Sequence, residues 1–575
     1  MDSRTAAHVL AQIGGLLELH GEDRFKSRAY HIAARAVLGT DADDITPLYK
    51  SGELRKLPGV GAATFSVLRE LVETGDSSYF ERLRENTPEG LLEMLRVPGM
   101  GTAKIRLIHE GLGVETVQQL EEAARDGRLA KLPRFGPKTA EKILKGIAFL
   151  KETGALLLFP HAFAEAQRVL AGVRRHPDVV RAEIAGSVRR RREVIADIDI
   201  VAACSADPAA VATSFAHAPG VRSAVGAGQA SVSIRYVDGT RLDLHCVEPS
   251  AFAVALWRGT GSAAHIDEVL AALRRKGLTL AGDELRRNGR TLPVAEEAEL
   301  FAAAGLAFIE PELREARGEV AAAASGALPS LVVESDIQGV LHCHSQYSDG
   351  GATIAEMAAA ARAHGWKYLG VSDHSVSAFY AGGLKPDAIR RQHEEIDELN
   401  AAAGDFVVLK GIEADILADG RVDYDEHVLD QFDYVIGSVH SRFSMSGPEM
   451  TERVLRALDD PHLTILGHPT GRLLLTREPY QIDMSAVIEK AAERGVVLEL
   501  NADPHRLDLD WTYCHDAKQR GVRIEIGPDA HSTHGLDNVE LGVAIARKGW
   551  LEKSDVLNCG SAAEVVEHAR RHRSS

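Results

Sequence analysis

The C-terminal half contains the feature that most constrains the fold, a series of seven short apolar runs that each lead into polar residues. The runs are 340–341, 368–371, 407–409, 434–436, 463–466, 496–500 and 524–526. Helical patterns such as 354–363 and 484–494 separate them. A strand and helix repeated in this way predict a (β/α)7 barrel, in which the residues after the strands gather on one face.

The polar residues that follow these strands are ligands of the kind that metals use. They are His342, His344, His374, Glu413, His440, His468, Asp529 and His531. A lone histidine in such a place is more often a satisfied polar residue, but six that converge with two carboxylates predict a metal site. Imidazole and carboxylate without thiolate suit Zn²⁺, Mn²⁺ or Fe. The five cysteines are scattered, with no Cys-x-x-Cys pair.

Residues 182–247 have a strand-rich pattern in which carboxylates recur. Asp197 and Asp199 are two residues apart on a predicted strand and so share a face. A later hairpin strand presents Arg241 and Asp243. An isolated Asp-x-Asp is more often a solvated strand face. Three converging carboxylates repel one another unless a cation neutralises them, and oxygen ligands of this kind suit Mg²⁺ or Mn²⁺.

One short pattern recurs three times in the first 150 residues, which read as almost entirely helical. It is Leu-Pro-Gly-Val-Gly at 57–61, Val-Pro-Gly-Met-Gly at 97–101 and a looser version at 132–138, each before an amphipathic helix. A single copy is more simply a glycine-containing turn, whereas three resemble helix-hairpin-helix modules. Backbone N–H groups at such a turn bind a DNA phosphate without reading sequence. The expected DNA-binding residues here are Gly59, Gly61, Gly99, Gly101, Gly136 and Lys138.

Charge divides the chain into two parts. The net charge of −17 would by itself argue against a nucleic-acid partner. Residues 1–317 hold 42 Lys and Arg against 42 Asp and Glu, so the acidic excess lies entirely in 318–575. Clusters such as Arg189–Arg192 therefore remain able to attract DNA. No apolar run approaches the roughly 20 residues of a bilayer span, so we expect a cytoplasmic protein with no membrane partner.

The strand-rich region resembles the palm of family X DNA polymerases, the nucleotidyltransferases related to DNA polymerase β. Gly186-Ser187-Val188-Arg189-Arg190, then Asp197-x-Asp199, then Arg241-x-Asp243 carry the resemblance. It implies that Asp197 and Asp199 bind both metals, that Asp243 binds the catalytic metal and the primer 3′ hydroxyl, and that Arg241 supports the site.

The same resemblance assigns residues to the nucleotide and to the DNA end. The nucleotide-binding residues would be Gly186, Ser187, Arg190, Thr260 and Gly261. Lys26 and Tyr30 would lie near a downstream 5′ phosphate. Among the departures from the family pattern, Val67 stands where the lyase lysine falls, and Arg258-Gly259 replaces the aromatic pair that screens the sugar. We therefore expect an altered polymerase.

The C-terminal motifs closely resemble a PHP domain, the polymerase and histidinol phosphatase phosphoesterase. They include His342-Cys343-His344-Ser345, Gly467-His468-Pro469 and Asp529-Ala530-His531-Ser532. The resemblance adds Asp349 and implies a cluster of up to three Mn, Zn or Fe ions. Its ligand sets would be His342, His344, Glu413 and Asp529; Glu413, His440 and His468; and Asp349, His374 and His531.

Residues 310–315 and 500–508 look like signatures of bacterial family X polymerases that carry a C-terminal PHP domain. The expected order is a helical DNA-end-binding domain with the first hairpin (1–80), a fingers-like helical domain with further hairpins (81–153), an α+β palm (154–250), a thumb (251–317), a linker (318–335) and a distorted PHP barrel (336–575). The resemblance implies gap filling from dNTPs on gapped, nicked or 3′-blocked DNA. The PHP domain would add a Mn-dependent 3′-5′ exonuclease, with 3′-phosphatase or abasic-site endonuclease as further activities.

Two other functions remain open. The lost aromatic pair allows a DNA-end-binding nuclease or scaffold with weak or lost polymerase activity. The barrel alone would also suit a small-molecule phosphatase. Primer extension with the Asp243→Ala variant and 3′-end trimming with the His344→Ala variant separate these from the leading hypothesis.

Overall fold

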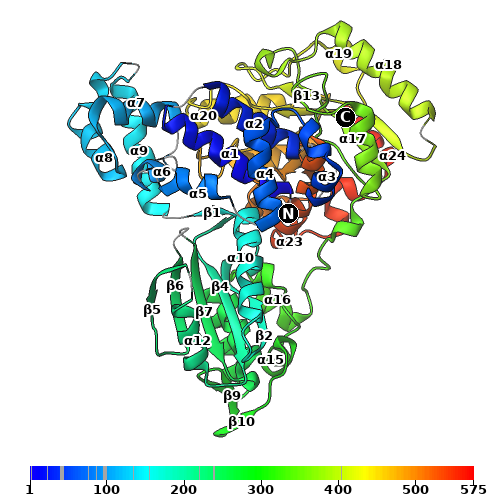
Figure 1. Cartoon of the computed structure of the whole chain (residues 1–575). Helices are drawn as coiled ribbons and strands as arrows, with labels where there is room; N and C mark the ends of the chain where they lie inside the picture. Colours follow the sequence, from blue (N-terminus) through cyan, green and yellow to red (C-terminus); the bar gives the residue numbers. More distant parts are fainter. Residues whose placement is uncertain are drawn as a thin grey trace. The chain divides into compact units, whose positions relative to one another are not determined.

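The computed structural model describes residues 1–575 except 2, 22–23, 39, 41–43, 75–76, 86, 88, 95–96, 98–99, 134, 154–155, 219, 237–239, 403 and 575. The chain forms two compact units, Met1–Ala155 and Leu156–Ser575 (Figure 1). Within the described ranges, no helix is both long enough and apolar enough to span a bilayer.

The first unit is helical. Its elements are α1 (Ser3–Leu19), α2 (Arg24–Leu38), α3 (Thr46–Ser51), η1 (Glu53–Lys56), α4 (Ala62–Thr74), α5 (Ser78–Glu85), α6 (Glu89–Met94), α7 (Thr102–Leu112), α8 (Val117–Arg125), η2 (Leu129–Lys131) and α9 (Pro137–Thr153). Two apolar clusters hold it together. One packs α1, α2 and α4 through residues such as Leu10, Val37 and Leu68, and the other packs α7, α8 and α9 through Ile105, Leu120 and Ile143. The second cluster also includes Leu16 and Leu19, so α1 contributes to both clusters.

The second unit begins with the palm. Its strands are β1 (Leu157–Leu158), β2 (Val179–Ile184), β3 (Val194–Ile195), β4 (Ile198–Cys204), β5 (Val221–Val225), β6 (Ser231–Tyr236) and β7 (Arg241–Val247). Five of them form a sheet in the order β2-β4-β7-β6-β5, with β4 and β7 parallel. Helices α10 (Phe159–Arg174) and α12 (Pro208–Ala216) cover one face, and α13 (Phe252–Thr260) packs on the other (Figure 1). The short α11 (Gly186–Arg189) follows β2.

The thumb follows as a smaller cluster of helices and a three-stranded sheet. It contains α14 (Ala263–Arg275), β8 (Leu278–Ala281), β9 (Glu284–Arg287), β10 (Arg290–Leu292), α15 (Glu297–Ala304) and η4 (Pro311–Leu313). The segment 318–335, expected as a linker, contains α16 (Glu319–Ser325) and η5 (Glu334–Asp336). Val320 and Ala323 pack in the thumb core, and buried Glu319 bonds His265 at 2.7 Å. The first part of this segment is therefore structurally part of the thumb.

The barrel has seven parallel strands in chain order, β11 (Gly339–Val340), β12 (Tyr368–Val371), β13 (Val407–Asp415), β14 (Tyr434–Ser438), β15 (Leu463–Leu466), β16 (Val497–Asn501) and β17 (Ile524–Gly527). A parallel bridge between Cys343 and Ala530 brings the first and last strands together beyond their ends. The predicted (β/α)7 architecture is therefore confirmed. β13 is longer than expected, so that Glu413 lies within the strand and not after it.

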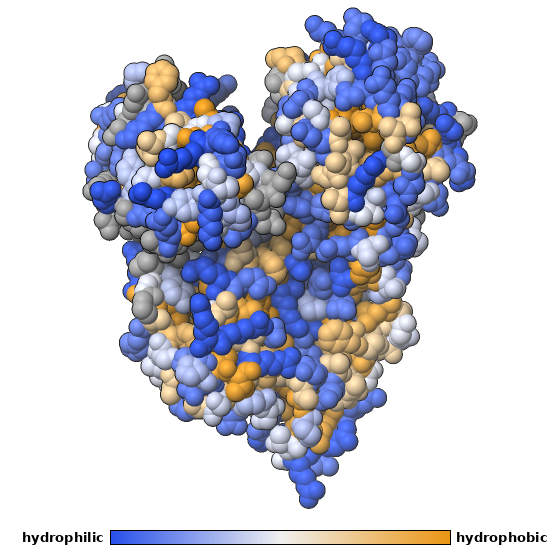
Figure 2. Space-filling model, turned by 45° about the vertical axis from the view of Figure 1, so that its right-hand side comes forward, coloured by the Kyte–Doolittle hydropathy of each residue, from blue (hydrophilic) through white to orange (hydrophobic). Residues whose placement is uncertain are grey.

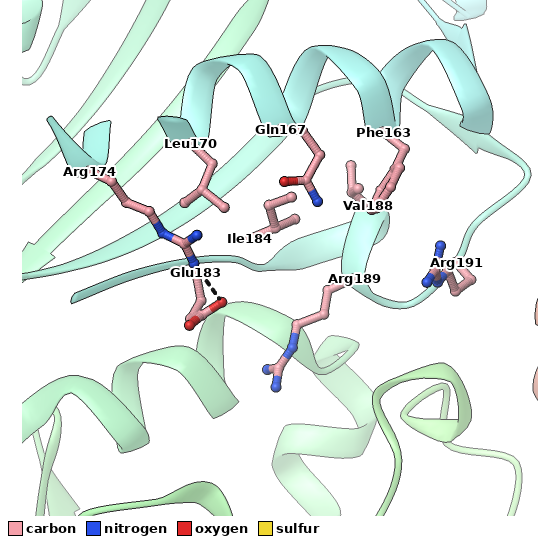
Figure 3. A pocket seen from close by; sticks show the side chains of 9 residues that line it. All are labelled: Phe163, Gln167, Leu170, Arg174, Glu183, Ile184, Val188, Arg189 and Arg191. Carbon is pink, nitrogen blue, oxygen red and sulfur yellow. Dashed lines mark hydrogen bonds and ion pairs between the residues drawn. The ribbon is translucent and has the colours of Figure 1, made fainter. Parts of the chain in front are cut away.

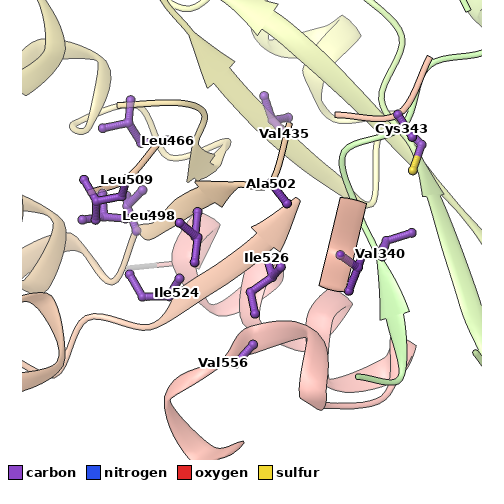
Figure 4. Close-up of a cluster of buried hydrophobic side chains, with 14 of the residues drawn as sticks. Val340, Cys343, Val435, Leu466, Leu498, Ala502, Leu509, Ile524, Ile526 and Val556 are labelled. Atoms are coloured by element: carbon purple, nitrogen blue, oxygen red, sulfur yellow. The ribbon is translucent and has the colours of Figure 1, made fainter. Parts of the chain in front are cut away.

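Helices surround this sheet. They are α17 (Ile354–Ala363), α18 (Pro386–Ala402), α19 (Glu426–Leu429), α20 (Gly447–Ala457), α21 (Met484–Arg494), α22 (Trp511–Gln519), α23 (Val539–Lys548) and α24 (Ala562–Ser574); η6 to η9 are Phe379–Ala381, Thr533–Asn538, Lys553–Asp555 and Leu557–Cys559. Figure 4 shows part of the main core, where Val435, Leu498 and Ile526 from three strands pack with their neighbours. This rigid core fixes the strand ends that carry the metal-binding side chains. Outside it, hydrophilic residues cover much of the face in Figure 2, with hydrophobic side chains in small groups between them.

Candidate metal centres and DNA-binding turns

The palm brings together the three predicted carboxylates. Asp199 on β4 stands opposite Asp243 on β7 in the parallel register, and Asp197 lies one residue before β4. One carboxylate oxygen from each of the three lies within 4.8 Å of the others. The buried isoleucines Ile198 and Ile200 hold this strand in the core. The period of two along β4 thus separates a core face from a carboxylate face, as the sequence predicted.

Gly186 allows the backbone after β2 to approach this site. Its φ is 59°, and a Cβ there would lie 1.7 Å from Oδ2 of Asp199 and 2.8 Å from its Cβ. Any side chain would therefore displace Asp199, whose carboxylate also accepts a hydrogen bond from the N–H of Ser187. Gly186 is required both for its conformation and for its closeness to the carboxylate.

The carboxylates disfavour one another's charge. Burial, Asp197 and Asp243 raise the pKa of Asp199 to about 7, although Arg190 acts in the opposite direction. Burial and Asp243 also raise the pKa of Asp197, while Arg241 lowers it. These groups fit divalent cations, because a cation would relieve the repulsion that the protein leaves uncompensated.

Three of the residues expected around the nucleotide differ in their hydrogen bonding. Ser187 Oγ is buried and has no hydrogen-bond partner within the described structure. Arg190 is held by Oε1 of Glu315 at 3.1 Å from its Nε and by the carbonyl of Thr260 at 2.6 Å from its Nη1. Thr260 differs from the expectation of direct nucleotide contact, because its side chain is fully buried and its hydroxyl accepts from Arg189 and donates to Leu256. Thr260 thus holds the side chains of Arg189 and Arg190.

Two further residues were expected at the polymerase site, Arg241 and Gly261, and their surroundings differ. Arg241, at the start of β7, is exposed and lies close enough to influence Asp197. Gly261, which caps α13, packs closely against α14: a Cβ there would lie 2.7 Å from the His265 ring. Gly261 therefore serves the close packing of α13 on α14.

A pocket of about 270 Å³ lies in the palm, against α10 (Figure 3). Its lining includes Phe163, Arg174, Glu183, Arg189 and Arg191, and none of the three carboxylates. Arg174 pairs with Glu183 at 3.3 Å, and Arg189 pairs with Glu297 at 2.5 Å. Since Arg174 and Arg189 already pair with carboxylates and no residue of the triad lines the pocket, the pocket is part of the palm's support and not its reaction centre.

The barrel gathers all nine predicted ligands at one end. Three ligand groups have atoms within 4.8 Å of one another: His344, Asp349, His374 and His531; His342, His344 and Asp529; and His374, Glu413 and His440. His468 joins the last group, with Nε2 at 3.0 Å from Oε1 of Glu413. The grouping differs in detail from the expected one, because His344 and His374 each take part in two sets. These two side chains thus link the three groups.

Several buried polar atoms in the barrel have positions that a metal explains. His342 Nε2, both ring nitrogens of His344 and Glu413 Oε2 are buried without a hydrogen bond of acceptable geometry to any described residue. The carboxylate oxygens nearest to these three imidazole nitrogens lie 3.3 to 3.8 Å away, and Glu413 Oε2 lies 2.9 Å from Nδ1 of His374. Buried polar atoms are nearly always satisfied, so this set fits cations placed among the imidazoles and carboxylates.

Protonation supports the same interpretation. Burial lowers the pKa of His344 and of His468 to about 3, so both rings are neutral and can donate a lone pair. Burial acts against the charge of His374, but Glu413 and Asp349 outweigh it and raise its pKa to about 10. Burial also opposes ionisation of Glu413, but His440 and His342 outweigh it and hold its pKa well below its usual range. In the absence of metal, a proton on His374 would balance the negative charge of Glu413 and Asp349, which a bound metal ion would otherwise balance.

A second layer of carboxylates orients the ligands. Glu499 bonds His342 Nδ1 at 2.5 Å and accepts from the backbone N–H of His468 at 2.5 Å, and Asp415 bonds His440 Nδ1 at 2.7 Å. Arg506 Nε lies 3.4 Å from Asp529 Oδ2. Glu499, Asp415 and Arg506 were not among the expected site residues. Glu499 lies on a predicted strand and Arg506 in the segment 500–508 that resembles the family, whereas Asp415 lies six residues past the predicted strand 407–409.

Two ligands have a strained backbone. His468 has φ 25° and Asp529 has φ 49°, in the left-handed region that non-glycine residues rarely adopt. Both follow directly from strand ends and are buried. Strain of this kind persists only where surrounding packing imposes it, and it is typical of sites that hold a ligand geometry in advance.

The described parts of the three hairpin turns share one feature. The carbonyls of Gly61, Gly101 and Gly136 accept the first hydrogen bonds of α4, α7 and α9. A Cβ at any of the three would meet nothing within 4 Å, so the turn backbone is open. Gly59 is different, because its φ is 77° and a Cβ would lie 2.6 Å from the backbone N of Ala33. Gly99 lies outside the described residues, and exposed Lys138 lies in the first turn of α9.

The residues expected near a 5′ phosphate both contact Tyr79. Lys26 Nζ lies 5.9 Å from its ring centroid, and the Tyr30 ring lies 6.2 Å from it. Tyr30 differs from the expectation, because it is buried in the core of α1, α2 and α4, and burial raises its pKa to about 12. Val67, at the lyase position, is also buried. Of these residues, only Lys26 is exposed.

Four family models match the chain. They are a helix-hairpin-helix domain (1–77), a SAM-like helix-hairpin-helix tandem (91–148), the DNA polymerase beta thumb (255–315) and the PHP domain (341–503). Hairpins, a carboxylate-bearing palm with its thumb, and a histidine-rich barrel together define a polymerase β-like protein joined to a PHP domain.

Relatives narrow this class. The DNA polymerase/3′-5′ exonuclease PolX of Bacillus subtilis (strain 168) is 34% identical over 576 residues, 100% of both chains. A probable phosphatase of Clostridium acetobutylicum is 30% identical over 241 residues, 40% of this chain and 93% of its own, and one of Caldanaerobacter subterraneus is 28% identical over 237 residues, 38% and 86%. The chain belongs to the PolX family of DNA polymerase/3′-5′ exonucleases, which confirms the family predicted from the sequence.

Proposed function

We propose that this PolX-family chain is a DNA repair enzyme that extends a 3′ end in its palm and removes nucleotides from a 3′ end in its barrel. The observation that carries the proposal is the presence of two distinct ligand clusters in one unit: three carboxylates in the palm and nine histidines and carboxylates in the barrel. The Bacillus relative is named for both activities and matches over the full chain.

In the palm, Asp197, Asp199 and Asp243 would hold Mg²⁺ or Mn²⁺. Such ions supply charge neutralisation at the transferred phosphoryl group and a lower pKa for the attacking hydroxyl. Ser187 and Arg190 would bind the triphosphate, since the Ser187 hydroxyl has no hydrogen-bond partner among the described residues and the Arg190 guanidinium is held beside Asp199 by Glu315 and Thr260. Gly186 lets the backbone N–H of Ser187 come close to this charge.

In the barrel, the nine ligands would hold up to three ions, with Mn²⁺ proposed and Zn²⁺ or Fe as alternatives that imidazole and carboxylate also suit. Bound ions supply a nucleophile at neutral pH and polarise the phosphoryl oxygens. Glu499 and Asp415 orient His342 and His440. Arg506, beside Asp529, would bind the phosphoryl group that the ions face. The substrate would be the 3′-terminal phosphodiester of DNA.

The DNA is proposed to be gapped, nicked or 3′-blocked, with dNTPs for the filling step. The open backbone turns at Gly61, Gly101 and Gly136 support binding that depends on the phosphate backbone and not on sequence. A second candidate activity is 3′-phosphatase, which the similarity of the barrel region to probable phosphatases favours.

The test is a pair of variants assayed for both activities on the same gapped DNA. Asp243→Ala should lower primer extension by at least about 10³-fold and leave 3′-end trimming within about twofold. His344→Ala should do the reverse. Equal extension by Asp243→Ala and wild type would refute the palm assignment, and intact trimming by His344→Ala would refute the barrel assignment.

A further inference from the structure

Helix α23 connects the barrel to the polymerase part of the second unit. Leu541 packs against both the barrel core and the palm core. At the end of the same helix, Arg547 pairs at 2.8 Å with Glu312, which lies in η4 of the thumb. The barrel thus contacts the segment that supports the nucleotide-binding arginines.

The last residue of α23, Lys548, is fully buried, which is unusual for a lysine. Its amine donates to the Arg190 backbone carbonyl at 3.2 Å, the Glu312 carbonyl at 3.4 Å and Oε1 of Glu315 at 2.5 Å. The indole of Trp511 lies 4.7 Å from Nζ. The acceptors lie in the palm (Arg190), in η4 (Glu312) and just after η4 (Glu315), although Lys548 belongs to the barrel.

The same oxygen of Glu315 also accepts from Arg190 Nε at 3.1 Å. One buried carboxylate oxygen therefore lies between Lys548 of the barrel and Arg190 of the palm, and Lys548 additionally holds the main chain of Arg190. Burial opposes ionisation of Glu315, but Lys548 and Arg190 outweigh it and lower its pKa. Removing the lysine would leave Glu315 with Arg190 and, at 4.0 Å, Arg192 as its basic partners, and the Arg190 carbonyl without this donor.

We infer that Lys548 is a positioning residue for the polymerase reaction, through which the PHP barrel orients Arg190 for the triphosphate of the incoming nucleotide. The inference rests on the proposed role of Arg190. Polymerisation therefore depends on the barrel's fold even where it does not depend on the barrel's chemistry. The reverse dependence is not expected, because Lys548 makes none of its described contacts with the nine metal ligands.

The experiment is steady-state single-nucleotide incorporation by the full chain carrying Lys548→Met. The KM for dNTP should rise roughly tenfold with kcat changed less than threefold, the order expected when one charge-assisted hydrogen bond is misaligned. Trimming of single-stranded DNA should equal that of wild type. The matched control is Lys518→Met, a barrel lysine that pairs only with barrel carboxylates in the described structure. An unchanged KM in Lys548→Met overturns the inference.

Arg190→Gln separates this inference from the proposal beneath it. If Arg190→Gln leaves the KM unchanged, the proposed role of Arg190 fails. If it raises the KM and Lys548→Met does not, only the inference fails. The double variant should show no further increase, because both changes remove one interaction. If Lys548→Met loses trimming as well, its fold is damaged, and Glu315→Gln must then show the same KM increase or the inference falls.

Discussion

The two metal centres solve the same electrostatic problem in different ways. The palm triad is only partly buried and made of carboxylates alone, and the protein leaves their repulsion largely uncompensated. The barrel ligands are mostly buried, mix imidazole with carboxylate, and are oriented by Glu499 and Asp415. We infer from this difference that the barrel would hold its ions more firmly than the palm, whose ions would arrive with the nucleotide.

Among substitutions that should affect one centre and not the other, the largest effect is expected at Gly186. Gly186→Ala places a methyl group against Asp199 and should lower primer extension by about 10²-fold or more, because small displacements of reacting groups have effects of this size. Trimming by the barrel should not change. The matched control is Gly172→Ala, a palm helix position where a Cβ meets nothing within 4 Å. Normal extension by Gly186→Ala would show that the close approach has no function.

The next effect concerns the second layer of the barrel. Glu499→Gln loosens His342 and should lower trimming by about 10- to 100-fold, the range found for residues that orient metal ligands. Primer extension by the same variant serves as its control and should stay at the wild-type level. A variant that trims normally would mean that burial alone orients His342.

The pH dependence should also distinguish the centres. Asp199 has a raised pKa of about 7, so a metal in the palm competes with a proton below that pH. The Mg²⁺ concentration for half-maximal extension should fall about tenfold per unit from pH 6 to 7 and level off above 7. In the metal-free chain, the sign for folding is opposite: the raised pKa makes stability decline as pH rises from about 4 to 7. A half-maximal concentration that does not vary between pH 6 and 8 would contradict this account.

The smallest effect is expected at the third hairpin. Lys138→Ala should weaken DNA binding at all sequences and reduce the slope of log affinity against log salt by about 1, as expected for one lost phosphate contact. Lys145→Ala is the matched control on the same helix, because Lys145 is exposed and already pairs with Glu141. An equal slope change in both variants would remove α9 from the proposed DNA-binding turns.

The sequence patterns predicted much of the fold and most of the residues that gather at the two candidate metal centres. Strand periodicity predicted the seven barrel strands and the shared face of Asp197 and Asp199, because a strand alternates its faces every residue. The burial of Thr260 and Tyr30 could not be predicted, since it depends on helices that pack against them from elsewhere in the chain. Glu499 and Lys548 were missed for the same reason: their partners His342 and Arg190 are more than 150 positions away. Local pattern does not encode such contacts.

We expect the barrel to retain metal ions when nucleotide is absent and the palm to lose them. The number of metal ions bound per chain tests this directly. The full chain would be loaded with Mn²⁺, passed through gel filtration without nucleotide, and measured by plasma mass spectrometry alongside Asp243→Ala and His344→Ala. The account predicts up to three ions per chain in wild type, the same number in Asp243→Ala and fewer in His344→Ala. Loss of ions from Asp243→Ala, or full retention by His344→Ala, would contradict it.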